Sequence, residues 1–171
     1  SKKINDQTST NLFLHAKSNW LNLDQNNDNF LDQPIGEAYV IGNRWFHFSP
    51  KGWEIQGGVK GTYMNNRGGT VKQSEASYIP WIYEQKVNRA EAWAKIGRVF
   101  EGQPWKSMGL QLSGVYHDQK GMYAQTKNYD ANQQSLYANY IYQSMIKNTN
   151  HIIKTGASFQ YDAVKENYNR T

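Results

Sequence analysis

Apolar and polar residues alternate along most of this chain with a period of two. In the segment 53–64, Ile55 and Val59 share one parity, while Gln56 and Lys60 share the other. Successive side chains of a β-strand point to opposite faces, so this pattern predicts a strand with one apolar and one polar face. The same period recurs at residues 12–20, 37–48, 90–100, 108–117, 135–146 and 151–161. We therefore predict an all-β, antiparallel fold with about seven long strands.

The length and spacing of these segments favour a membrane. Many of the predicted strands run for about 10 to 12 residues, which suits a tilted membrane-spanning strand better than an ordinary sheet strand. The expected connections are short at 49–52, 101–104 and 147–150, and long at 21–36, 67–89 and 119–134. Short turns on one side and long loops on the other are typical of outer-membrane β-barrels. Aromatic residues near the strand ends would form the interfacial girdle: Trp20, Trp45, Trp53, Tyr63, Trp105, Tyr116, Tyr142 and Tyr161.

The number of strands indicates that the chain does not close a barrel alone. Seven strands leave two open edges, which a bilayer does not tolerate, and bacterial single-chain barrels have even strand numbers. The inward positions carry many Gly, Ser, Gln, Lys and Asn residues, which fits a wide, wet lumen. We expect residues 1–171 to be a fragment of a larger transmembrane barrel domain in a bacterial outer membrane. The alternative is a soluble β-sandwich, which would have shorter strands and more even loops.

Composition changes this picture only in part. The 171 residues carry a net charge of +5, but Lys and Arg are scattered, so we expect no nucleic-acid partner. The absence of Cys excludes disulfides and thiolate metal sites. A mean hydropathy of −0.85 suggests a soluble chain, whereas an aromatic content of 14% is high for one. Both values follow if the apolar, aromatic-rich strand faces are averaged together with the polar strand faces and the polar loops.

Three stretches of the sequence resemble a known family. The first is residues 20–34, WLNLDQNNDNFLDQP; the second combines residues 43–45, 57–61 and 66–69; the third runs from 97–100 through 104–109 and 135–137 to 154–162. In this order and spacing they resemble the barrel of TonB-dependent outer-membrane receptors, of the kind common in Bacteroidetes.

The resemblance implies a barrel of about 22 strands around an N-terminal plug domain. Residues 1–171 would supply part of the wall, without the plug, and would meet the TonB complex through a part not in this chain. Such receptors bind a scarce nutrient, such as a siderophore, haem, cobalamin or glycan, and import it into the periplasm. Two alternatives stay open: a passive porin or small structural barrel, and a soluble carbohydrate-binding β-sheet module.

One loop has the spacing of a cation site. Asp24, Asn26, Asp28 and Asp32 stand at positions 1, 3, 5 and 9 of an EF-hand loop, and the carbonyl of Phe30 stands at position 7. These oxygens would suit a structural Ca²⁺, although no acidic residue occupies position 12. The alternative is an Asp/Asn turn closed by hydrogen bonds from side chains to the backbone.

The candidate ligand contacts are Arg67, Trp81, Tyr83 and His117. Trp81 and Tyr83 could stack on a flat or sugar-like ligand, or could serve as girdle or loop-packing residues. The inward polar positions, which would line water or contact a plug, are His15, Lys17, Glu54, Lys60, Glu91, Lys95, Gln111, His117, Asn139, Gln143 and Lys154. The sequence contains neither a Gly-x-Ser-x-Gly elbow nor a P-loop, so we expect no enzyme and no catalytic residue.

Overall fold

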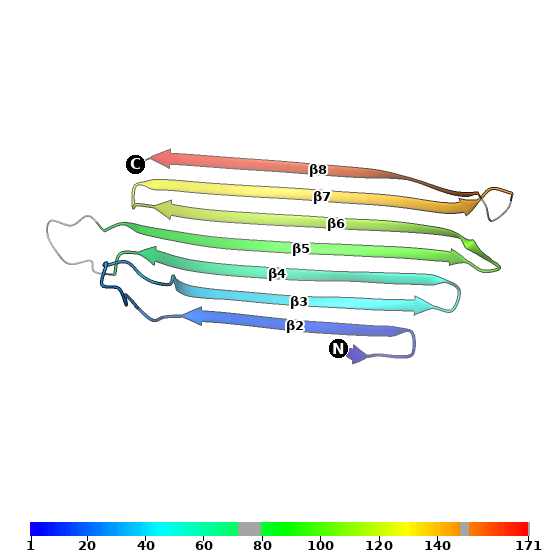
Figure 1. Ribbon diagram of the computed structural model, residues 1–171, viewed down its shortest axis with the longest axis horizontal. Coiled ribbons are helices and arrows are strands. Elements are labelled where there is room, and N and C mark those ends of the chain that lie inside the picture. The colour runs from blue at the N-terminus through cyan, green and yellow to red at the C-terminus, as the bar shows by residue number, and fades with distance from the viewer. Residues whose placement is uncertain (72–79, 148–150, 171) are drawn as a thin grey trace.

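The chain forms a single antiparallel sheet of eight strands in sequence order, from β1 to β8 (Figure 1). The computed structural model describes residues 1–71, 80–147 and 151–170. The strands are β1 (Lys2–Lys3), β2 (Thr8–Asn19), β3 (Ile35–Ser49), β4 (Trp53–Gly69), β5 (Ile82–Phe100), β6 (Gln103–Tyr123), β7 (Lys127–Met145) and β8 (Ile152–Arg170). The predicted all-β, antiparallel class with seven long strands is therefore confirmed. In the described part of the chain, no helix is long and apolar enough to cross a membrane.

The hydrogen-bonded register places side chains of the same kind beside one another. Leu12 pairs with Asn43, Asn43 with Val59, and Val59 with Ala92, and the row continues through Gly114 and Leu136 to Tyr161. The face that carries this row is called the apolar face. It comprises the even positions of β2, β5, β6 and β7 and the odd positions of β3, β4 and β8. The remaining positions form the polar face, which includes all eleven predicted inward polar residues.

The strands are longer than predicted, and one predicted connection is wrong. Strands β2 to β8 contain 12 to 21 residues. Backbone pairing of β6 with β7 continues to Tyr123 and Lys127, so the expected long loop at 119–134 is a connection of only three residues. Two of these, Ala124 and Gln125, have positive φ values of 51° and 58°. Likewise, the expected connection at 67–89 shortens to residues 70–81, because β4 and β5 stay paired up to Gly69 and Ile82.

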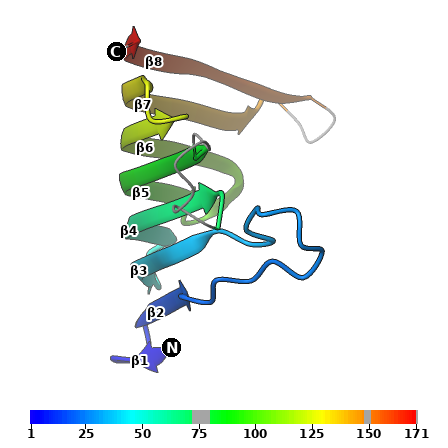
Figure 2. The same ribbon diagram turned by 90° about the vertical axis from the view of Figure 1, so that its left-hand side faces the viewer.

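The sheet is open. Strands β1 and β8 lie at opposite ends of the stack of strands (Figure 2), and no described residue of one pairs with the other. These residues therefore form no closed barrel. The sheet also has almost no hydrophobic core of its own: among the described apolar residues, only Ile82 and Val87 are buried, with exposed fractions of 5% and 7%.

The tight turn between β3 and β4 depends on Gly52. Its φ is +78°, its N–H donates to the carbonyl of Ser49, and its own carbonyl accepts the N–H of Val99. A Cβ atom at this position would collide with the carbonyl oxygen of Val99, whereas Gly102, with a φ of +70°, has open space around it.

We predict that Gly52→Ala destabilises the protein more than Gly102→Ala. Both variants incur about 1 kcal/mol for the left-handed backbone conformation, and only the first adds a steric collision. Equilibrium unfolding monitored by tryptophan fluorescence measures the difference. Equal destabilisation of the two variants would show that this turn relaxes without disturbing β5.

Candidate functional site

The apolar face is the more exposed face of the sheet. Leu12, Leu14, Val59 and Phe159 have exposed fractions of 59%, 69%, 60% and 61%. A contiguous apolar patch of this kind marks a surface that contacts a partner or a membrane, because soluble monomers rarely expose one. The face is therefore a candidate binding surface along its whole width.

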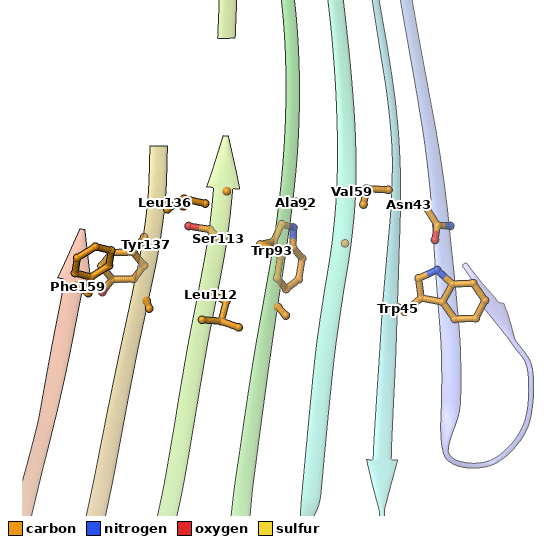
Figure 3. Close-up of a pocket in the computed structure, with 14 residues that line it drawn as sticks. Asn43, Trp45, Val59, Ala92, Trp93, Leu112, Ser113, Leu136, Tyr137 and Phe159 are labelled. Carbon is orange, nitrogen blue, oxygen red and sulfur yellow. The ribbon is translucent and has the colours of Figure 1, made fainter. Parts of the chain in front are cut away.

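Small residues in the middle of the apolar face leave shallow hollows between larger side chains. Figure 3 shows one of them, with Trp45, Val59, Leu112, Leu136 and Phe159 contributed by five different strands. Gly57, Ala92, Ala94, Gly114 and Ala138 lie between these side chains on the same face. The hollows are lined almost entirely by carbon, so they would accept acyl chains or other apolar groups but offer few polar contacts.

The middle of the apolar face carries no Asp, Glu, Lys or Arg, and this part is called the apolar band. On β5 the band lies between Lys86 and Arg98, and on β6 it lies between Lys106 and Asp118. On β4 it extends from Trp53 to Tyr63. The first charged residues beyond it on the side of the long loops are Glu37, Arg67, Lys86, Asp118, Asp130 and Lys165.

The apolar band crosses the register of the sheet obliquely. The row through Ala16 is apolar or aromatic on β2 to β4 and polar on β5 to β8: Ala16, Tyr39, Tyr63, Asn88, Asp118, Asn132 and Lys165. The row through Thr8 is polar on β2 and β3 and mainly apolar from β4 onward: Thr8, His47, Ile55, Ile96, Leu110, Tyr140 and Ala157.

The size of this drift follows from the two edges of the band. From β2 to β8, the edge near the long loops moves by four residues, from the row of Ala16 to that of Tyr161. The edge near the short turns moves by eight residues: it lies in the row of Leu12 on β2, which is the row of Tyr161 on β8, but at Ile153 on β8 itself. Over six strand steps, the mean drift is about one residue per strand. With about 3.3 Å per residue and about 4.8 Å between strands, the band is inclined by about 35° to the perpendicular of the strands.

The polar face is held together by bonds between strands. Glu91 on β5 accepts two hydrogen bonds from Arg89, at 2.7 and 3.0 Å, and forms an ion pair with Lys60 on β4. Its side chain is only 18% exposed, so its charge depends on these two cations. Arg44 donates to Gln56 at 2.6 Å and also lies over the ring of Trp93.

His117 joins this cluster from β6. It stands directly across from Arg89 in the register, and its Nδ1 atom is buried without a hydrogen-bond partner in the described structure. The sequence identified His117, Lys60 and Glu91 as inward residues but missed Arg89. Nothing in the sequence indicates that these residues lie together, because the cross-strand register alone decides which positions are neighbours.

The other predicted ligand contacts do not assemble with His117. Trp81 and Tyr83 lie together at the end of β5, with ring centroids 6.1 Å apart, and Trp81 also contacts Phe30 at 6.5 Å. Arg67 lies on the apolar face, away from Tyr83, and His117 is several rows farther along the polar face. The structure therefore offers an aromatic group at the long-loop end and a charged cluster in the middle of the sheet.

The predicted cation loop is folded by its own hydrogen bonds. Asp24 accepts the N–H groups of Asp28 and Asn29 at 3.1 and 3.0 Å, and Asp28 accepts that of Phe30 at 2.8 Å. Asp32 accepts the N–H of Gln25 at 3.0 Å. Among the described residues, no group of three or more His, Asp or Glu side chains is placed to hold a metal ion. These hydrogen bonds are the ones that a side-chain-closed turn requires, and the Ca²⁺ site stays a prediction.

No protein-family model, curated protein or solved structure matches the chain. Its function is therefore inferred from the chemistry of the two faces and from the sequence resemblance.

We predict that Glu91→Gln destabilises the sheet by about 1–3 kcal/mol, because it leaves two partly buried cations without their counter-ion. Glu54→Gln is the matched control on the same face, since Glu54 is exposed and accepts a hydrogen bond from the neutral side chain of Gln56. Urea unfolding of the two variants measures the difference. Equal urea midpoints for the two variants would show that water solvates Lys60 and Arg89 well enough to replace the lost carboxylate.

We also predict that Asp24→Ala exposes residues 20–34 to protease to the same extent with Ca²⁺ and with a chelator. The variant removes two hydrogen bonds to the backbone, each of which contributes about 1 kcal/mol. Limited proteolysis of wild type and variant in both conditions measures this effect. Protection of the wild type by Ca²⁺, lost in the variant, would instead support the cation site.

Proposed function

We propose that this chain is part of the wall of a β-barrel in a bacterial outer membrane, and that the whole protein is a TonB-dependent receptor that imports a nutrient. The apolar face would contact lipid, and the polar face would line the lumen and contact a plug domain. The observation that carries the proposal is the charge-free apolar band, which crosses all seven long strands on one face of the sheet.

The dimensions of the band support a bilayer. On β4 it extends over ten residue steps, from Trp53 to Tyr63, which is about 33 Å along the strand. At a tilt of about 40° this corresponds to about 25 Å along the membrane normal, the height of the apolar band in outer-membrane barrels. Of the aromatic residues predicted to form the girdle, Trp53 and Tyr142 lie at the short-turn edge of the band, and Tyr63, Tyr116 and Tyr161 lie at the long-loop edge, whereas Trp105 lies on the polar face.

The inclination of the band supports a tilted barrel wall. A band that is horizontal in the membrane runs obliquely across the register of a sheet whose strands are tilted. The observed drift of about one residue per strand gives a tilt of about 35°, within the range of about 35–45° known for transmembrane barrels. A soluble sheet packed against another layer has no reason to shift its apolar residues steadily from strand to strand.

The two open edges support a barrel larger than this sheet. Among the described residues, strand β8 pairs with β7 alone, which leaves its other edge open, and unpaired backbone groups are not tolerated in lipid. We infer that further strands continue the sheet on both sides. The polar face fits a plug-filled lumen, because Lys60, Arg89 and Glu91 pair with one another while exposed polar side chains such as Lys95 and Gln111 are available to a second polar surface.

The receptor class, rather than a passive porin, comes from the sequence resemblance. A porin and a receptor share the same type of wall and differ in whether a plug fills it. Uptake of a labelled nutrient that stops when the TonB complex is de-energised would support the receptor, while uptake that continues by diffusion would support the porin.

We predict that Val59→Arg strongly impairs insertion of the whole protein into the outer membrane. Val59 is 60% exposed at the centre of the apolar band, so an arginine there is harmless in water but costs about 2–4 kcal/mol at the middle of a bilayer. The measurement is the amount of protein that remains in urea-washed outer membranes, together with its stability in detergent or lipid.

Gln111→Arg provides the matched control, because Gln111 is also exposed but lies on the polar face, three residues from the row of Val59. We expect this variant to insert like the wild type. A Val59→Arg protein as abundant and stable as Gln111→Arg, or a wild-type protein found outside the membrane, would contradict the proposal.

A further inference from the structure

A cationic and aromatic cluster marks the short-turn end of the apolar band. The guanidinium carbon of Arg98 lies 4.7 Å from the ring centroids of both Trp53 and Phe100. The ammonium nitrogen of Lys106 lies 4.8 Å from the Phe100 ring. These four residues, called the Arg98 cluster, come from three adjacent strands, β4, β5 and β6, and their rings hold two cations on the apolar side of the sheet.

The cations of the Arg98 cluster have no acidic partner in the described structure. The ion pairs found there involve Lys3, Lys60 and Arg89, and not Arg98 or Lys106. The Nε atom of Arg98 is buried without a hydrogen-bond partner. Cations held against aromatic rings are partly desolvated, and with Nε buried it is the terminal N–H groups of the planar guanidinium that can bind an anion.

The local backbone accommodates the arrangement. The register between β5 and β6 shifts between Val99 and Phe100, inside the cluster. Such bulges are common at the rims of barrels, where they re-aim side chains. Here the bulge lies beside Phe100, whose ring faces both Arg98 and Lys106.

The position of the cluster indicates what kind of anion it meets. Arg98 is the next residue after Ile96 on the apolar face of β5, at the edge of the charge-free band, and therefore at the depth of lipid headgroups in the proposed wall. Lys51 and Glu101 in the two adjacent turns carry opposite charges, so Arg98 and Lys106 set the net positive charge at this end. The opposite end of the band is different, because the first charged residues there are three acids, Glu37, Asp118 and Asp130, and three bases, Arg67, Lys86 and Lys165. The two ends would thus meet the two leaflets with different net charge.

We propose that the Arg98 cluster binds the phosphate of an anionic phospholipid in the leaflet at the short-turn end. This inference rests on the proposed membrane location. Arg98 and Lys106 donate hydrogen bonds to the phosphate oxygens, and Trp53 and Phe100 hold the two cations against the boundary between headgroups and acyl chains. Charge-assisted bonds of this type are shorter and stronger than neutral ones.

The experiment uses the full-length protein purified in detergent. Phosphatidylglycerol or phosphatidylcholine with identical acyl chains is added, and the lipid molecules retained are counted by native mass spectrometry. The wild type is expected to retain phosphatidylglycerol in preference. Each cationic side chain near a membrane surface contributes about five-fold, so Arg98→Gln should reduce the preference about five-fold and Arg98→Gln with Lys106→Gln about 25-fold.

Two further variants separate charge from folding. Lys95→Gln removes an exposed cation from the same strand but from the polar face, and should leave the preference unchanged. Arg98→Lys keeps the charge and should retain most of the preference, which also shows that the site tolerates substitution without loss of the fold.

Equal retention of the two lipids by the wild type, or an unchanged preference in the double variant, would overturn the proposal. In either case the protein would still fractionate with the outer membrane, so this failure differs from failure of the proposed function. A wild-type protein that remains outside the membrane would instead refute the proposed function itself.

Discussion

The backbone register between neighbouring strands is the constraint on which the rest of this structure depends. Each long strand alternates between apolar and polar residues by itself, but only the cross-strand hydrogen bonds place these alternations in phase. A shift of one residue between β4 and β5 would move Ala92 to the polar face and bring Glu91 or Trp93 beside Val59. Because every strand pairs with its neighbour in sequence, the meander keeps seven alternations aligned without any layer packed against the sheet.

The two faces that result are the reverse of those in a water-soluble protein. The apolar face is widely exposed and has hollows lined by carbon, whereas Glu91 on the polar face is largely covered by its neighbours. A sheet of this kind has no hydrophobic core from which to gain stability in water. In the proposed barrel wall it would gain stability where lipid covers the apolar band and where further strands satisfy the backbone groups along its two edges. The oblique course of the band would fit both requirements in one tilted wall.

The two ends of the band differ in structure as well as in charge. At the long-loop end, β2 and β3 are linked through residues 20–34, which join the end of β4 through the pairing of Phe30 with Thr70. This end gathers the aromatic side chains of Phe30, Trp81 and Tyr83. At the short-turn end, Arg98 and Lys106 lie against aromatic rings. In the proposed wall, the two ends would therefore face the two sides of the membrane with different chemistry.

The sequence by itself determined the all-β class, the seven long strands and the division of each strand into two faces, because a period of two is a local property.

The sequence did not determine the ends of the strands. Residues 119–134 are mostly polar on both faces, so no hydrophobic alternation reveals that β6 and β7 stay paired up to Tyr123 and Lys127, and neither Gly nor an Asn-Gly pair marks the turn. Tertiary structure alone decided that Lys60, Arg89 and Glu91 meet, that Arg67 and Tyr83 lie on opposite faces, and that the apolar band is inclined. These features are relations between strands, and they are fixed by hydrogen-bond register rather than by the order of residues within any one strand.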